Sequence, residues 1–173
     1  MGANDGLDAI EARVKPALRV PGGWIAGGIF GRDRDGTPVY YDRFAQLYPR
    51  ALSRHADEDD VLRYACWRNE TMTACLEACS TPARAQRLFF VVIDAKGLAM
   101  RAFWPRGLRT FKLMSQRDED YWPDRLKRCV IVNAPWLFAQ LYTIVRVFLP
   151  ARTRERIDVV SAGDTAARLA RYV

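Results

Sequence analysis

Three short runs in the second half of the chain constrain its fold more than any other feature. Residues Leu88–Ile93 form an uninterrupted apolar run, and Cys129–Val132 and Ile157–Val160 are two shorter β-prone runs. A strand that is apolar throughout is typical of a sheet covered on both faces, whereas a half-exposed strand alternates apolar and polar residues. The runs therefore predict strands of a buried, parallel-leaning sheet.

Helical segments separate these strands. Strands that alternate with helices imply βαβ units and a largely parallel sheet. A length of 173 residues suits one domain, so we predict a single α/β domain over residues 1–173. The expected helices are Leu7–Leu18, which is weak, Phe44–Tyr48, Asp57–Ala78, Phe103–Gln116, Trp122–Lys127, Trp136–Leu149 and Asp164–Tyr172.

The first half of the chain offers weaker strand signals. The turn sequence Arg32–Gly36 precedes a short β-prone run, Pro38–Tyr41. Before it, the glycines and proline of Pro21–Gly28 indicate a loop or an irregular edge strand. The acidic cluster Asp57–Asp60 favours the start of a long helix, because negative charge stabilises a helix N-terminus.

The net charge of +7 narrows the choice of partners. A basic protein suits nucleic acid or an anionic membrane surface. The arginines are spread along the chain and form no compact block of the kind that marks a nucleic-acid arm. We therefore expect a transient contact with an anionic membrane surface and no nucleic-acid partner.

Signals for enzyme chemistry and for metal binding are missing from the sequence. His55 is the only histidine, and the four cysteines lack paired C-x-x-C spacing. The glycines of Gly22–Gly31 match no phosphate-binding loop, and no G-x-S-x-G nucleophile motif occurs. We predict a non-enzymatic protein without metal or cofactor. Its cysteines suit a reduced, cytosolic setting.

The segment Trp136–Leu149 has an unusual pattern. Its only polar residues are Gln140, Thr143 and Arg146, which form one narrow stripe on a helix. A helix of this length extends about 21 Å, which is too short to span a bilayer. Two interpretations stay open from the pattern alone: a buried core helix, or a lid that covers an apolar cavity and meets lipid on its other side.

Several motifs occur in an order that resembles the CRAL-TRIO domain family. Asp35–Tyr41 is similar to the family's D-G-R-P-V-Y entry strand, and Phe90–Gly97 to its central strand and D-x-K-G-like turn. Tyr121–Leu126 resembles Y-Y-P-E-R-[LM], and Cys129–Trp136 resembles I-I-N-A-P. The last match, to F-L-x-x-x-T-x-x-K-I, comprises Phe148, Leu149, Thr153, Arg156 and Ile157. The resemblance covers about residues 16–172.

The resemblance implies a mostly parallel sheet that floors an apolar lipid pocket, with helices backing the sheet and a mobile helix gating the pocket. Trp136–Leu149 stands at the position of the gate, with hinges near Asn133–Pro135 and Leu149–Pro150. The expected pocket and gate residues are Phe89, Val91, Ile93, Phe103, Trp136, Phe138, Leu141, Val145 and Phe148.

Head-group residues follow from the same resemblance. In the phosphatidylinositol-transfer branch, a Glu, a Thr and a Lys hold the inositol phosphate, and the matching positions are Asp124, Thr153 and Arg156. All three residues keep related chemistry, since Asp retains the carboxylate and Arg the cation. Tyr40 matches one tyrosine of the branch that exchanges phosphatidylcholine, but Ile29 replaces the other. Phosphatidylinositol is therefore the favoured ligand.

Other interpretations remain open at the level of sequence. The pocket could carry a sterol, tocopherol or retinoid, or the domain could recruit a partner without carrying lipid. We expect the family's N-terminal helical segment and its closing C-terminal stretch to be absent from this chain. Under the favoured interpretation, the protein is cytoplasmic and peripherally membrane-associated.

Overall fold

The computed structural model describes residues 27–43, 57–83, 85–98 and 105–173. The expected helices Leu7–Leu18 and Phe44–Tyr48, and the expected pocket residue Phe103, lie outside these ranges. Within the described ranges, no helix combines the length and the apolar composition needed to cross a membrane.

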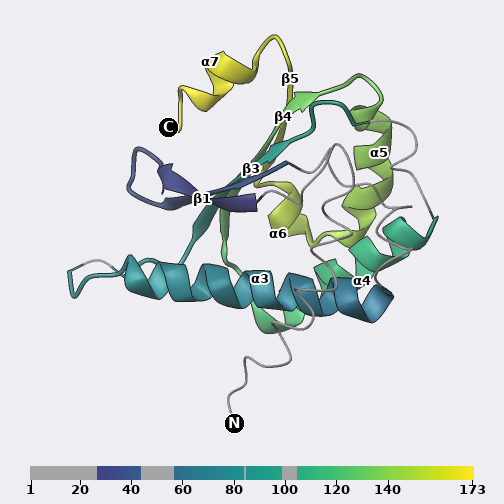
Figure 1. Ribbon diagram of the computed structural model, residues 1–173. Coiled ribbons are helices and arrows are strands. Elements are labelled where there is room, and N and C mark those ends of the chain that lie inside the picture. The colour runs from purple at the N-terminus through teal and green to yellow at the C-terminus, as the bar shows by residue number, and fades with distance from the viewer. Residues whose placement is uncertain (1–26, 44–56, 84, 99–104) are drawn as a thin grey trace.

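Five strands form one sheet in the order β1-β2-β3-β4-β5 (Figure 1). The edge strand β1 is antiparallel to β2, and the pairs β2–β3, β3–β4 and β4–β5 are all parallel. The mostly parallel α/β sheet predicted from the sequence is therefore confirmed. The strands are β1 (Gly27–Arg32), β2 (Pro38–Asp42), β3 (Phe89–Asp94), β4 (Leu126–Ala134) and β5 (Ile157–Ser161).

The helices connect these strands and lie on both sides of the sheet (Figure 1). The long helix α3 contacts α4, while α7 lies on the other side of the sheet from α5. The helices are α3 (Glu58–Ala78), α4 (Pro105–Tyr121), α5 (Phe138–Val145), the 3-10 turn η3 (Arg146–Phe148), α6 (Ala151–Arg154) and α7 (Thr165–Leu169).

Helix α3 begins where the acidic cluster predicted it. The side chain of Asp57 accepts a hydrogen bond of 2.8 Å from the Asp60 backbone N–H, and the Asp57 N–H donates to the Asp60 carboxylate at 3.4 Å. This reciprocal capping box satisfies backbone donors that the first turn leaves without a helical partner.

Two helix predictions need correction. The helix expected at Trp122–Lys127 is wrong: α4 continues to Tyr121, and Lys127 already belongs to β4. The left-handed backbone of Asp124, with φ of 56°, interrupts a helix there, and the chain is extended from Leu126 onward. The segment Trp136–Leu149 is helical only from Phe138, and it tightens to a 3-10 turn before Leu149 becomes extended.

Alternation of side chains divides the sheet into two apolar faces. On the first face, Phe90, Val92, Val130, Val132 and neighbouring valines form a buried cluster against α7. Tyr172 packs its ring 5.1 Å from that of Phe90. Each strand directs alternate side chains to the two faces of the sheet, and this first face is covered by α7.

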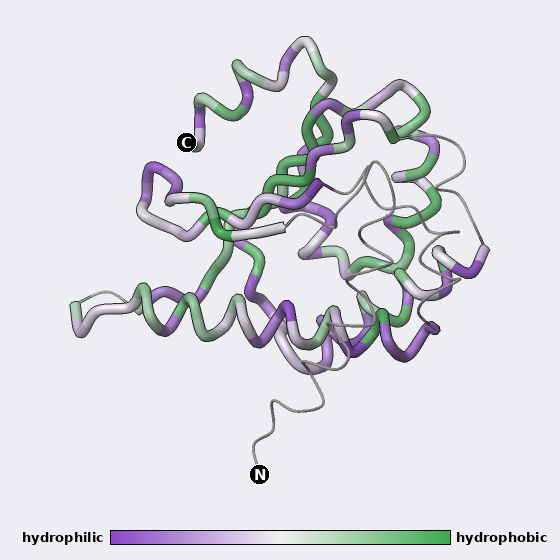
Figure 2. Tube along the Cα trace, in the orientation of Figure 1, coloured by the Kyte–Doolittle hydropathy of each residue, from purple (hydrophilic) through white to green (hydrophobic). Residues whose placement is uncertain are grey.

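The second face packs against α5. Here Cys129 and Ile131 of β4 cluster with Phe138 and Leu141 of the helix, with Val91 at the margin. Figure 2 shows apolar segments concentrated in the central strands and recurring along α5. Burial of both faces explains why Phe89–Ile93 of β3 and Cys129–Val132 of β4 are continuous apolar runs.

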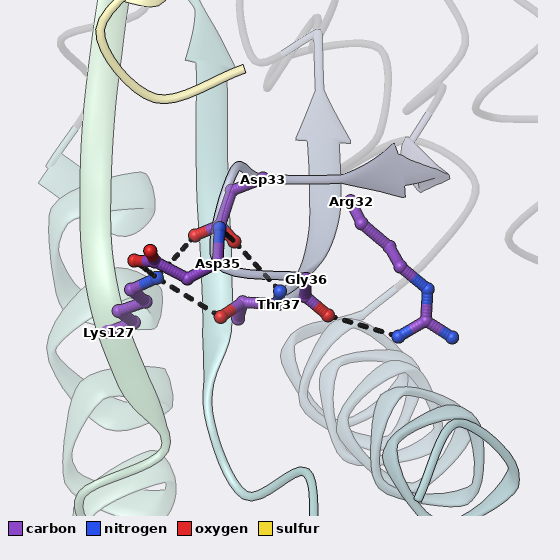
Figure 3. Close-up of polar contacts among 6 residues, drawn as sticks. All are labelled: Arg32, Asp33, Asp35, Gly36, Thr37 and Lys127. Carbon is purple, nitrogen blue, oxygen red and sulfur yellow. Dashed lines mark hydrogen bonds and ion pairs between the residues drawn. The ribbon is translucent and has the colours of Figure 1, made fainter. Parts of the chain in front are cut away.

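A buried ion pair holds the β1–β2 hairpin against β4 (Figure 3). Lys127 on β4 contacts Asp33 at 2.5 Å and Asp35 at 2.7 Å, and it donates to the Thr37 hydroxyl at 3.1 Å. Asp33 also accepts hydrogen bonds from the backbone N–H groups of Asp35 and Thr37. Burial by itself raises the pKa of Asp33, but these hydrogen bonds and the Lys127 charge outweigh it and lower the pKa.

We predict that Lys127→Met destabilises the domain by about 1–3 kcal/mol at pH 7, because it leaves the buried Asp33 carboxylate without its cation. The matched variant Lys96→Met removes an exposed lysine and should change stability by less than about 0.5 kcal/mol. Urea denaturation measures both.

The ion pair between Lys127 and Asp33 also predicts that the stability of the domain depends on pH. A carboxyl with a lowered pKa stabilises the fold above its unfolded pKa of about 3.9 and loses that contribution as pH falls through its folded pKa. The difference in stability between wild type and Lys127→Met should therefore shrink below about pH 4. A difference that stays constant down to pH 3 would contradict the assigned role.

Candidate functional site

A cavity of about 260 Å³ lies between the sheet and the helices α3, α4 and α6. Strands β2 and β3 form its floor, α3 and α4 form two walls, and the segment from Leu149 to Arg156 forms a third. The cavity is therefore assembled from segments far apart in the sequence.

The floor consists of the β3 residues that face away from α7. Phe89, Val91 and Ile93 all line the cavity, as predicted for these three pocket residues. The intervening Phe90 and Val92 belong to the core cluster under α7. The alternation of β3 thus provides the cavity with an apolar floor and the opposite face with a core.

Tyr40 also lines the cavity, from the neighbouring strand β2, where it pairs with Val91. A side chain on Gly27 would place its Cβ 2.0 Å from the Tyr40 hydroxyl, so glycine at this position leaves room for the phenol ring. Burial raises the pKa of Tyr40 to about 12. The hydroxyl therefore stays protonated at neutral pH and can donate a hydrogen bond.

The three residues matched to the phosphate site lie on the same cavity. Asp124, Thr153 and Arg156 all line it, although 28 residues of sequence separate the first from the second. Arg156 donates a hydrogen bond of 2.6 Å to the Leu126 carbonyl and lies 3.9 Å from the Asp124 carboxylate. The structure therefore brings the predicted head-group residues together at a partly solvent-exposed rim.

Sequence reasoning missed Arg152 at this rim. Its Nε lies 3.3 Å from the Asp124 carboxylate, and it forms an ion pair with Glu119 of α4. Two arginines thus share the Asp124 carboxylate, so a phosphate that binds them competes with Asp124. The sequence signal was that Arg152 lies in the same short segment as Thr153 and Arg156.

A second polar group on the cavity wall was also missed. Asp42 at the end of β2 lies 4.0 Å from Arg68 of α3, and both line the cavity. Asp118 of α4 also lies close enough to feel the Arg68 charge, and it accepts a 2.6 Å hydrogen bond from Asn69. For both carboxyls, burial outweighs the nearby arginine and raises the pKa.

The predicted gate residues occupy different surroundings. Phe138 and Leu141 are buried, and Val145 packs against the same cluster on the sheet. Phe148 lines a separate hollow beside the cavity, together with Leu149 and Pro150, and Lys112 lies 6.0 Å from its ring centre. Trp136 is exposed at the start of the segment.

None of these five gate side chains lines the cavity, whereas Leu149 and Pro150, at the end of the segment, do. Helix α5, which forms most of the predicted gate, therefore packs against the sheet beside the cavity. Its two ends carry the predicted hinge residues. Asn133 has a left-handed backbone with φ of 52°, and Leu149 is extended before Pro150.

Comparisons with known proteins identify a family and relatives for this chain. Residues 25–173 match the model of the CRAL/TRIO domain. Two proteins called real-time, from Aedes aegypti and Anopheles gambiae, are each 29% identical to the chain over 143 residues, or 79% of it. The chain spans only 20% and 19% of the length of these relatives.

A solved structure shares the fold. The crystal structure of Sfh5 superposes with a TM-score of 0.67 at 22% identity, covering 82% of this chain and 49% of that one. The family match includes every strand of the sheet and every described residue that lines the cavity. On this evidence, the chain belongs to the CRAL/TRIO domain family, whose members bind or transfer lipids.

Proposed function

We propose that this domain binds a phospholipid, with phosphatidylinositol the favoured ligand, and exchanges it with a membrane. One observation carries the proposal: the apolar floor of β3 and the polar trio Asp124, Thr153 and Arg156 line one cavity. Apolar surface suits acyl chains, and an arginine at a partly exposed rim suits a phosphate. The proposed activity is physical exchange without a chemical step.

Arg156 is suited to a phosphate through geometry as well as charge. Its guanidinium has five N–H donors, of which one is used on the Leu126 carbonyl at 2.6 Å. The contact to Asp124 is long, at 3.9 Å, so further donors are available to a ligand. Thr153, one helical turn earlier, supplies a hydroxyl on the same wall.

The cavity must open for a two-chain lipid to enter. A volume of about 260 Å³ lies below the 300–1,000 Å³ typical of small-molecule pockets. Movement of α5 and η3 about the hinges at Asn133–Pro135 and Leu149–Pro150 would uncover the sheet beside the cavity and extend the cavity there, at the cost of exposing Phe138 and Leu141. Burial of acyl chains, worth about 0.8 kcal/mol per methylene, offsets that cost.

Exposed apolar side chains on the gate favour a membrane surface. Trp136 is 81% exposed, Val147 66% and Ile144 45%. All three belong to the segment that would move, so insertion of these side chains into the lipid interface would couple opening to membrane contact. We propose accordingly that the domain acts as a peripheral protein at a cytoplasmic membrane surface, where its positive charge favours anionic lipid.

We predict that Arg156→Ala weakens phosphatidylinositol binding roughly tenfold, because it removes a charged hydrogen-bond donor from the rim. Uptake of a neutral lipid without a phosphate, such as diacylglycerol, should change little. Mass spectrometry of lipid extracted from the protein after incubation with mixed vesicles measures both.

The matched control is Arg171→Ala, which removes an exposed arginine beyond α7 on the other side of the sheet. It should leave uptake of both lipids at the wild-type level. Equal loss of phosphatidylinositol and diacylglycerol in Arg156→Ala would show that Arg156 supports the fold and not the head group.

We also predict that Val147→Asp reduces binding to anionic vesicles roughly tenfold, because it removes an apolar side chain from the interface and adds a repelled charge. The matched variant Val173→Asp changes a half-exposed valine beyond α7 and should bind as wild type does. Vesicle co-sedimentation provides the measurement. Equal binding by all three proteins would remove the gate from the proposed membrane contact.

A further inference from the structure

Two buried polar atoms beside the cavity lack a hydrogen-bond partner among the described residues. They are Nε of Arg68, which is a donor, and Oδ1 of Asp42, which is an acceptor. An unsatisfied buried polar group costs about 1–3 kcal/mol, so such groups call for a partner that the protein itself does not supply.

The two atoms belong to one ion pair. Another oxygen of Asp42, Oδ2, lies 4.0 Å from a terminal guanidinium nitrogen of Arg68. That distance is too long for a hydrogen bond. Both side chains are mostly buried, at 21% exposed for Arg68 and 13% for Asp42, and both line the cavity. The unpaired donor and the unpaired acceptor therefore both belong to side chains of the cavity wall.

The charges around this pair disfavour an anion. Arg68 is the cation, and Asp42 and Asp118 are two carboxyls under its influence, so the group has no positive charge in excess. Burial raises the pKa of both carboxyls despite Arg68, which indicates that further negative charge would be costly. A phosphate or carboxylate is thus better placed at the exposed rim with Arg152 and Arg156.

A neutral hydroxyl group can pair with both the donor and the acceptor, and it adds no negative charge. Its oxygen accepts from an N–H, and its O–H donates to a carboxylate, so one hydroxyl can satisfy both atoms. We propose that Arg68 and Asp42 form a hydroxyl-binding subsite that selects lipids carrying a free hydroxyl group. This inference rests on the proposed function, since it specifies the chemistry of the lipid that the cavity receives.

Two kinds of lipid supply that chemistry. One is a phospholipid whose head group carries ring hydroxyls, such as phosphatidylinositol, and the other is an apolar ligand with a single alcohol. Each can be compared with a similar lipid that lacks the hydroxyl. Phosphatidylinositol is paired with phosphatidylmethanol, which keeps the phosphodiester charge, and hexadecanol is paired with hexadecyl methyl ether, which keeps the chain.

The experiment is a competition within each pair. The protein is incubated with phosphatidylcholine vesicles that contain equal amounts of both members of a pair, and the lipid recovered with it is measured by mass spectrometry. Wild type should favour the hydroxyl member roughly tenfold in at least one pair, and that pair identifies the source of the hydroxyl.

The variant that tests the assigned atoms is Arg68→Lys. Lysine keeps the positive charge but has a methylene where arginine has Nε, so it removes the unpaired donor selectively. In this variant, the ratio of the hydroxyl lipid to its counterpart should fall toward one. Uptake of the counterpart without the hydroxyl should stay constant. Arg63→Lys, on an exposed position of the same helix, should keep the wild-type preference.

The outcomes separate the inference from the proposed function. A wild-type ratio near one in both pairs, with lipid taken up, overturns the hydroxyl subsite and leaves lipid binding intact. An unchanged preference in folded Arg68→Lys also overturns it. Absence of every probe from wild type overturns both proposals. The wild-type ratios require no variant, so they decide the inference even where Arg68→Lys fails to fold.

Discussion

Alternation of side chains on the parallel strands β2 to β5 is the constraint on which the rest of the domain depends. In β3, Phe90 and Val92 face α7, while Phe89, Val91 and Ile93 face the cavity. A shift of one residue in the pairing would exchange these sets and turn core side chains into the cavity. The register Tyr40↔Val91 and Asp42↔Ile93 therefore determines which residues a ligand can meet.

Two carboxylates, one beside the first recognisable motif and one within the second, hold this register. Asp33, beside the D-G turn, anchors the β1–β2 hairpin to Lys127 of β4. Asp94, which ends β3, accepts hydrogen bonds from Tyr41 of β2 and from Asn133 at the end of β4. Burial would raise the pKa of Asp94, but these contacts and the Lys96 N–H lower it. Asp94 thus ties Asn133, at the first predicted hinge, to the central strand.

The cavity has two polar centres with different electrostatic surroundings. At the rim, Arg152 and Arg156 share Asp124 in contact with solvent, where a salt bridge is weak and a phosphate can replace the carboxylate. On the α3 wall, Arg68 and Asp42 are mostly buried, where unpaired polar atoms are costly and a neutral partner is favoured. Under the proposed function, the apolar floor between them would accommodate the rest of a lipid.

The sequence by itself determined the sheet, the long helix α3 and the family, because continuous apolar runs, an acidic cluster at a helix start and motif order are local signals that survive without knowledge of packing. It also indicated Asp124, Thr153 and Arg156, although only through resemblance. Local pattern failed at Trp122–Lys127, where a left-handed residue interrupts the helical spacing.

Only the tertiary structure decided which polar side chains reach the cavity. Asp42 and Arg68 look like solvated charges in the sequence, because nothing near either residue reveals that β2 and α3 will bring them within 4.0 Å of each other. The gate shows the same limit: its apolar pattern suits a core helix and a lid equally, and packing against the sheet placed Phe138 and Leu141 inside and Trp136 outside. Contacts between segments distant in sequence depend on how whole elements pack, which no local pattern records.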